Sequence, residues 1–191
     1  MKSTVFKALT VINAVLILLG AVGCVYILTS NCGIYYSVSA IVELIALIFS
    51  VFYYLKGYQK NAAGDYRLYM LLYAFTYLVE NVACALDYDN IGVESKVSLT
   101  IVFSMLLYGN ALILAIGKDL GKKLSYTLCG VNIFVYVLPL IGMAIPGLIT
   151  FANEAFEVSG VVLYAIWLIL AFNTLVMTIA KYADKAARNT Q

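Results

Sequence analysis

The segment IYYSVSAIVELIALIFSVFYYLKGYQK, residues 34–60, contains the pattern that decides the fold. Its first part, residues 34–55, carries a single charged side chain, Glu43. A helix of about 20 mostly apolar residues is long enough to cross the hydrocarbon core of a membrane. Lys56 and Lys60 follow directly, and lysines that flank such a helix are retained on the cytoplasmic side. The segment therefore predicts a transmembrane helix that ends in the cytoplasm.

Further apolar segments of similar length lie on both sides of this one, and no linker is long enough to separate two domains. We therefore predict one integral membrane domain over residues 1–191, an all-α bundle of six transmembrane helices. The predicted spans are residues 5–29, 34–55, 68–86, 97–117, 124–150 and 159–180. The first span continues past Cys24 further than a cleaved lipoprotein signal requires, so we interpret it as an uncleaved helix.

Lysine and arginine are distributed unequally between the two sets of predicted loops. Of the 12 cations, only Lys96 falls on the side that holds the acidic loops. The other eleven share the opposite side: Lys2, Lys7, Lys56, Lys60, Arg67, Lys118, Lys122, Lys123, Lys181, Lys185 and Arg188. Because cationic loops resist translocation, we predict a multi-pass protein of the cell membrane with both termini in the cytoplasm. Membrane lipids are its expected partners.

The composition excludes several classes of protein. The chain has 12% charged residues, whereas soluble domains have roughly 25%. Its net charge of +2 is too small to predict nucleic-acid binding. It has no histidine, and its four cysteines lack the C-x-x-C spacing of metal and redox sites. We therefore expect no metal, no cofactor and no catalytic residue, while a disulfide bridge from Cys32 to Cys24 or Cys84 stays open.

Two glutamates lie inside the predicted spans at a matching depth. Glu43 precedes Lys56 by 13 residues, and Glu80 follows Arg67 by 13 residues. At about 1.5 Å per residue, both lie roughly 20 Å from the cytoplasmic edge. A carboxylate that faces lipid is costly, so we expect both side chains to face the bundle and to share a proton.

The third predicted span carries an aromatic stripe that leads to the second glutamate. Its members are three or four residues apart and share one helix face: Tyr66, Tyr69, Tyr73, Tyr77 and Glu80. We interpret the polar part of this face as a site for a cation or a polar headgroup. The candidate ligand-binding residues are Glu43, Glu80, Asn81, Tyr73 and Tyr77. The alternative is that the carboxyls are neutral and bond to neighbouring helices, and that the tyrosines only pack.

Four asparagines lie nearer the cytoplasmic edge, at depths of about 9–14 Å. They are Asn13, Asn110, Asn132 and Asn173. Asparagine side chains commonly form hydrogen bonds between membrane helices, so we predict an interhelical polar layer. In the fifth span, Pro139 and Pro146 each remove a backbone hydrogen bond, and we expect a kink there.

A resemblance to a known family rests on four segments in order. They are Phe6 to Thr10, Ile48 to Ser50, Ala74 with Phe75, and Gly160 to Tyr164 with Leu170 and Ala171. These segments resemble helices of the YhhN-type lysoplasmalogenases, a family of membrane proteins. The resemblance implies a membrane-embedded hydrolase that acts on ether lipids. However, the two aspartates of the family would fall at Tyr54 and Leu168, and its histidine at Val79 or Glu80. The family also has more helices, so no catalytic residue carries over.

We expect an integral membrane protein that holds a small amphiphile or polar solute in an intramembrane site without catalysis. Three alternatives stay open. The layout resembles the substrate-binding subunits of energy-coupling-factor transporters, which would make the chain part of a small-molecule importer. A diverged lysoplasmalogenase would need Glu43 or Glu80 as its acid. In a structural or regulatory protein, the polar residues would serve only to join helices.

Overall fold

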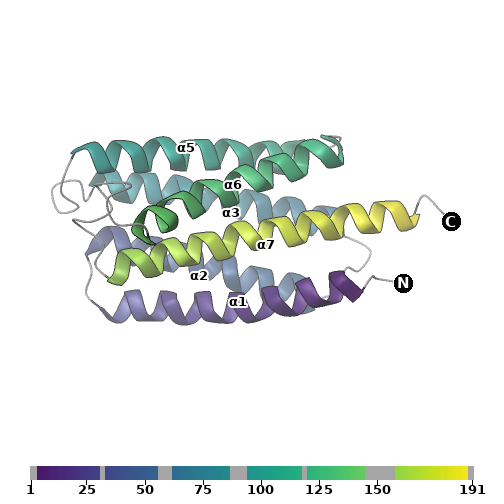
Figure 1. Cartoon of the computed structure of the whole chain (residues 1–191), viewed down its shortest axis with the longest axis horizontal. Coiled ribbons are helices and arrows are strands. Elements are labelled where there is room, and N and C mark those ends of the chain that lie inside the picture. The colour runs from purple at the N-terminus through teal and green to yellow at the C-terminus, as the bar shows by residue number, and fades with distance from the viewer. Residues whose placement is uncertain are drawn as a thin grey trace.

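The computed structural model of the chain describes residues 4–30, 33–55, 62–86, 94–117, 120–144 and 158–188. These residues form six α-helices and no β-strand (Figure 1). The helices are α1 (Thr4–Thr29), α2 (Ile34–Leu55), α3 (Ala62–Leu86), α5 (Glu94–Ile116), α6 (Gly121–Ala144) and α7 (Val158–Arg188). The predicted all-α class is therefore confirmed for this part of the chain.

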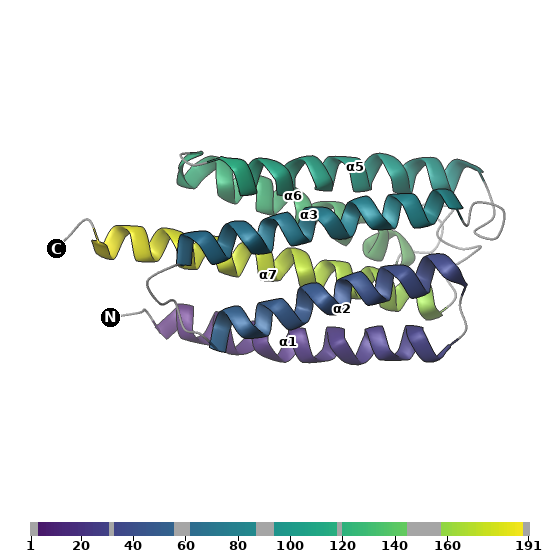
Figure 2. The ribbon, with the colours of Figure 1, turned by 180° about the vertical axis from the view of Figure 1, so that it is seen from behind.

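Successive helices run in opposite directions along the bundle (Figures 1 and 2). As a result, the first residue of α1 and the last residue of α7 lie at the same end of the bundle. The described cations Arg67, Lys122, Lys123 and Lys181 belong to the parts of α3, α6 and α7 at this end, which we call the basic end. These four cations therefore lie together at one end of the bundle, as the distribution of lysine and arginine in the sequence predicts.

Helix α7 lies at the centre of the packing. It contacts α1, α2, α3 and α6, whereas α1 contacts only α2 and α7 among the closely packed pairs of described helices. Its buried face combines apolar and polar side chains, including Trp167, Leu170, Asn173 and Thr178. Polar groups on α7 can therefore reach partners on most of the other helices.

Two glycines beside the beginnings of helices have an unusual backbone conformation. Gly33, directly before α2, has a φ of 96°, and Gly121, at the start of α6, has a φ of 74°. A side chain with a β-carbon is disfavoured in this left-handed region, so glycine suits both positions. Before Gly33, the Ser30 hydroxyl donates to the Tyr26 carbonyl over 2.7 Å. This bond satisfies one of the free carbonyls at the end of α1.

The outer surface of the bundle is apolar. On α1, Val11 is 64% exposed and Val22 is 67% exposed. The parts of helices long and apolar enough to cross a membrane are Ala8–Thr29, Ile34–Phe52 and Val161–Tyr182, among the described residues. A soluble protein would leave this surface to water at a large hydrophobic cost, so the structure is that of a helical protein compatible with a membrane location.

The helices differ from the predicted spans mainly at their ends. Helix α3 begins at Ala62 rather than 68, and α7 continues to Arg188 rather than 180. The reason is that an apolar span ends where charges begin, whereas helical hydrogen bonds continue into water. Helix α6 passes through Pro139 and ends at Ala144, and residues 145–150, with Pro146, lie outside the described residues.

Candidate functional site

The aromatic stripe on α3 forms a buried column inside the bundle. Its five side chains are at most 2% exposed: Tyr66, Tyr69, Tyr73, Tyr77 and Glu80. They share one helix face, as their spacing predicts, and this face points toward α2 and α7. The column therefore extends from the interior of the bundle, at Glu80, to the basic end, at Tyr66.

Glu43 and Glu80 form a buried carboxyl pair. Glu43 lies on α2 and is 0% exposed, and Glu80 lies on α3 and is 2% exposed. Their carboxyl groups interact directly with each other. The indole Nε1–H of Trp167, on α7, donates to Glu80 Oε1 over 3.1 Å. The prediction that both glutamates face the bundle is therefore confirmed.

Several buried oxygens of α2 and α3 lack a donor among the described residues, apart from the contact between the two carboxyls. They are both carboxyl oxygens of Glu43, Oε2 of Glu80, Oδ1 of Asn81 and Oγ of Ser39. Ser39 precedes Glu43 by one helical turn and is also fully buried. The Asn81 amide donates to the Tyr77 carbonyl of its own helix over 2.7 Å, which leaves its oxygen unused. The site is thus rich in acceptors and poor in donors.

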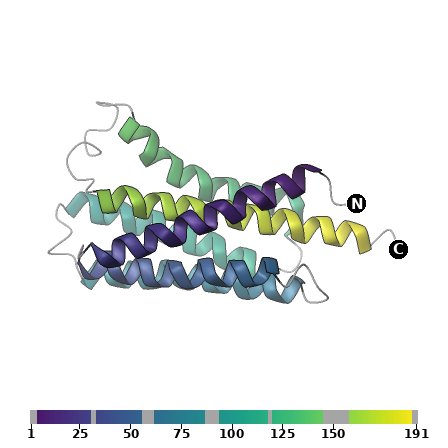
Figure 3. The same ribbon diagram turned by 90° about the horizontal axis from the view of Figure 1, so that it is seen from below.

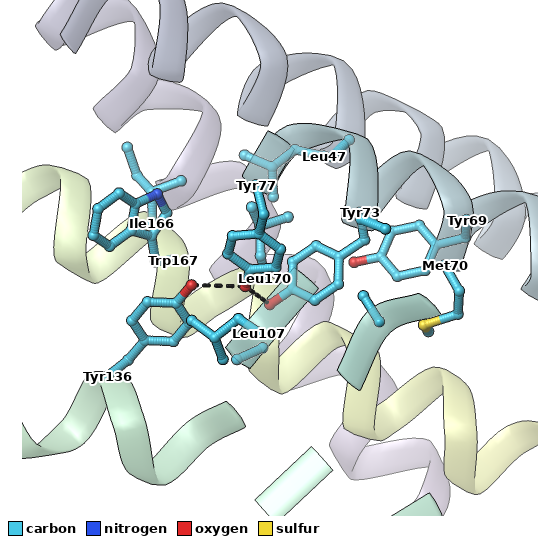
Figure 4. Packing of buried hydrophobic residues seen from close by; sticks show 14 of the residues in the cluster. Leu47, Tyr69, Met70, Tyr73, Tyr77, Leu107, Tyr136, Ile166, Trp167 and Leu170 are labelled. Atoms are coloured by element: carbon cyan, nitrogen blue, oxygen red, sulfur yellow. Dashed lines mark hydrogen bonds between the residues drawn. The ribbon is translucent and has the colours of Figure 1, made fainter. Parts of the chain in front are cut away.

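Aromatic side chains line the pair on the side of α6 and α7. The Tyr136 hydroxyl donates to the Tyr77 hydroxyl over 2.7 Å, and the Tyr77 hydroxyl donates to that of Tyr73 (Figure 4). The Trp167 ring lies 5.6 Å from the Tyr136 ring and 4.9 Å from the Tyr164 ring, measured between centroids. Figure 4 shows the rings of Tyr77, Tyr136 and Trp167 gathered between α3, α6 and α7. An aromatic cluster with polar hydroxyl and indole groups therefore adjoins the carboxyl pair.

Sequence reasoning missed three contributors to this site, namely Ser39, Tyr136 and Trp167. For Trp167, the sequence contains a feature that could have predicted its place in the site. Trp167 is the single tryptophan of the chain and lies inside a membrane-length apolar segment, six residues from its beginning at Val161. A buried indole N–H needs an acceptor, and few acceptors lie at that depth. The predicted ligand-binding residues Tyr73, Tyr77 and Asn81 are all buried on α3, with Asn81 next to Glu80 in sequence, Tyr77 about one turn before it and Tyr73 about two turns before it.

The four asparagines form interhelical hydrogen bonds in two separate pairs. The Asn13 amide donates to Asn173 Oδ1 over 2.7 Å and joins α1 to α7. The Asn110 amide donates to Asn132 Oδ1 over 2.8 Å and joins α5 to α6. The expected interhelical role is therefore observed, while the arrangement is two pairs rather than one connected network.

The Asn173 amide also donates to two other helices. It contacts Ser50 Oγ over 2.6 Å and the Tyr69 hydroxyl over 2.7 Å. Asn173 thus links α7 to α1, α2 and α3 at one level of the bundle. We call Asn13, Ser50, Tyr69 and Asn173 the asparagine junction.

At the basic end, the column finishes against a cation. The Tyr66 hydroxyl lies 2.9 Å from Thr178 Oγ1, and the thiol of Cys129 lies 3.4 Å from the same oxygen. Lys181 Nζ lies 4.4 Å from the centroid of the Tyr66 ring. A lysine above a tyrosine ring is stabilised by the negative ring face, so this contact holds a positive charge at the end of the column.

The described part of the chain holds no cluster of three or more metal-ligating acid, cysteine or histidine side chains. Cys24 and Cys129 are buried free thiols, and Cys32 lies outside the described residues. Of the positions at which the lysoplasmalogenase resemblance would require aspartates, Leu168 packs on the bundle core from α7. Tyr54 belongs to α2.

Comparison with models of known families, with characterised proteins and with solved structures finds no match to this chain. The resemblance to lysoplasmalogenases therefore stays a prediction from sequence. Arguments about function rest on the carboxyl pair and its surroundings.

Proposed function

We propose that this chain is a membrane protein that holds a small amphiphile or polar solute at the carboxyl pair, without catalysing a reaction on it. The observation that carries the proposal is the surplus of buried acceptors. Glu43 and Glu80 face each other from two helices and bond to each other, while three of their four carboxyl oxygens have no donor outside the pair among the described residues. Buried polar groups of native proteins nearly always have partners, so these oxygens indicate a missing donor.

The energetics favour a ligand or a proton at this place. Each buried polar atom without a partner costs about 1–3 kcal/mol, and a charged one costs more. A single proton shared by the pair would satisfy one oxygen and remove one charge. The remaining oxygens, with those of Ser39 and Asn81, would still accept bonds from an ammonium, amide or hydroxyl group. A polar headgroup with several donors therefore matches the site better than a proton alone.

Helix α6 offers a route by which such a ligand reaches the pair. Pro139 lies three residues after Tyr136 and cannot donate to the carbonyl of Val135, so the helix is weakened beside the site. Figure 3 shows the C-terminal part of α6 diverging from α7. Movement of α6 would carry the Tyr136 hydroxyl away from Tyr77 and would open the aromatic side of the pair toward the membrane.

The same proposal includes a position in the cell membrane. We infer six membrane crossings, with both termini in the cytoplasm and lipids around the apolar outer surface. The apolar side chains exposed on α1 and the concentration of Arg67, Lys122, Lys123 and Lys181 at the basic end support this orientation. In this orientation the carboxyl pair lies within the hydrocarbon region, where an amphiphile could present its polar group to it.

A structural role is the second candidate, and the asparagine junction favours it. Asn173 bonds to Asn13, Ser50 and Tyr69 on three other helices, which is what interhelical stabilisation requires. Under this alternative the carboxyl pair would be neutral and would contribute only to packing.

Native mass spectrometry of the full chain, released from a gentle detergent, separates the two candidates. We expect a bound species on the parent protein that is lost in Glu43→Gln and in Glu80→Gln, because each variant removes a carboxylate while keeping its shape. Glu94→Gln is the matched control, since Glu94 is the first residue of α5 and undergoes the same chemical change. If parent and all three variants carry the same species, or none, the proposed site is refuted.

A further inference from the structure

We infer that the ligand of the carboxyl pair is a small organic monocation, and that its binding releases one proton from the pair. This inference rests on the proposed function and names its ligand class.

A positive partner is the counter-charge that the described side chains do not offer to the pair once it loses a proton. The cations whose side chains the structure describes, Arg67, Lys122, Lys123 and Lys181, all lie toward the basic end. Arg67 is 13 residues from Glu80 along α3, which corresponds to about 20 Å. No described side chain can therefore neutralise the pair by direct contact. Isolated buried charges are too costly in a low-dielectric interior, so the ligand-free pair is neutral and holds two protons.

Proton exchange follows from the same reasoning. If a monocation binds, one glutamate loses its proton and becomes the counter-charge, while the other keeps its proton and donates to the first. One proton leaves as one positive charge arrives, and the site stays neutral. Trp167 Nε1–H, which donates to Glu80 Oε1 over 3.1 Å, already stabilises a negative charge on Glu80.

The aromatic groups select an organic cation over a hydrated metal ion. Trp167 contacts Glu80 through its indole N–H, and its ring lies 5.6 Å from that of Tyr136 and 4.9 Å from that of Tyr164 between centroids, so an aromatic cluster adjoins the pair. Aromatic faces attract alkylammonium and similar cations, and tryptophan does so most strongly. Such cations are more weakly hydrated than metal ions, so they lose less hydration free energy when they leave water. A metal ion prefers several convergent ligands, and the described residues contain no such cluster.

The groups around the pair are not expected to supply the exchanged proton. Cys24 of α1, Tyr73 and Tyr77 of α3, and Tyr136 of α6 interact with the two glutamates. Helix α7 contributes the neutral indole of Trp167. On α5, Tyr108 is the one titratable residue whose side chain the structure describes. Thiols and phenols are ordinarily neutral at pH 7, so they do not supply the exchanged proton.

The single tryptophan of the chain provides a reporter at the site. The full chain in detergent micelles is titrated with N-hexylpyridinium, a cation that quenches tryptophan fluorescence on contact. We expect saturable quenching of Trp167. Hexyltrimethylammonium, a cation that does not quench, should reverse it. Its uncharged carbon analogue, 2,2-dimethyloctane, has the same shape and should not.

The variants and the pH dependence complete the test. We expect saturable quenching to weaken by at least about tenfold in Glu43→Gln and in Glu80→Gln, a loss of about 1.4 kcal/mol or more. It should be absent in the double variant and unchanged in Glu94→Gln. Exchange of one proton for one cation requires the apparent affinity of the parent to rise about tenfold per pH unit until the pair has lost the proton. A far-ultraviolet circular dichroism spectrum equal to that of the parent checks that each variant is folded.

Two results would overturn the inference. If the neutral analogue competes as well as hexyltrimethylammonium, the ligand class is wrong, although the native mass spectrometry experiment can still support a bound neutral amphiphile. If quenching is saturable but equal in parent and double variant, or independent of pH in the parent, the pair is not the cation site. Only non-saturable quenching in every variant, as expected from partition of the probe into micelles, also counts against the inference.

Discussion

Replacement of Asn173 by leucine is the sharpest test of how this bundle is held together. The Asn173 side chain makes three hydrogen bonds to three other helices, with Asn13, Ser50 and Tyr69. Leucine has nearly the same shape, so Asn173→Leu removes the bonds without a large cavity. Asn110→Leu is the matched control, because Asn110 makes one such bond, to Asn132.

The expected magnitude follows from the number of bonds lost. An interhelical hydrogen bond in a membrane protein contributes on average about 0.6 kcal/mol and at most about 1.7 kcal/mol. Three bonds at the average value give a loss of about 2 kcal/mol in the free energy of unfolding for Asn173→Leu, against about 0.6 kcal/mol for Asn110→Leu. The difference between the two variants should therefore exceed about 1 kcal/mol.

The assay is reversible unfolding of the purified protein by sodium dodecyl sulfate in mixed micelles, followed by circular dichroism and by Trp167 fluorescence. Parent and variants should show parallel transitions, displaced to lower denaturant for Asn173→Leu. Equal losses for Asn173→Leu and Asn110→Leu would refute the reasoning, because they would mean that the junction is no stronger than a single bond. Tyr69→Phe, which removes one of the three bonds, should fall between parent and Asn173→Leu.

Three further predictions concern topology, the carboxyl pair and catalysis. A reporter enzyme that is active only outside the cytoplasm, fused after Gln191, should be inactive, and strong activity would exclude a cytoplasmic C-terminus. In a double-mutant cycle on ligand retention, Glu43→Gln and Glu80→Gln should be non-additive, because the two carboxyls act as one site; additive losses would separate them. The purified protein should release no aldehyde from lysoplasmalogen above a heat-inactivated control, since Tyr54 and Leu168 cannot replace two aspartates. Turnover that disappears in Glu80→Gln would contradict this and would identify Glu80 as the acid.

The sequence predicts the carboxyl pair because depth along a straight helix can be counted. Glu43 and Glu80 lie equally far from the cations that follow or precede them, and the antiparallel packing of α2 and α3 brings equal depths together. Burial follows from cost, since lipid cannot accept a carboxylate. The matching depth follows from the position of each glutamate along its helix, and the burial follows from the unfavourable transfer of a carboxylate into lipid. Neither step requires knowledge of which other helices are neighbours.

The partners of the pair could not be predicted in the same way. Tyr136 and Trp167 reach the site only because α6 and α7 are rotated so that these side chains point toward α3. Rotation about the helix axis is read from an amphipathic pattern, which is weak in helices that are apolar on all sides. The pairing of Asn13 with Asn173 was hidden for a related reason, because α1 and α7 are neighbours in space and not in sequence.

The two polar clusters of the bundle differ in how completely their atoms are bonded, and this difference separates stabilisation from binding. At the asparagine junction, both functional groups of Asn173 have partners on other helices. At the carboxyl pair, three glutamate oxygens and the nearby acceptors of Ser39 and Asn81 have none among the described residues. If both clusters served only to join helices, the one with more costly groups should be the better satisfied, since a buried carboxyl loses more on leaving water than an amide does. Both amide atoms of Asn173 are bonded, whereas three carboxyl oxygens of Glu43 and Glu80 have no donor outside the pair among the described residues. The proposed cationic partner from outside the chain would account for this difference.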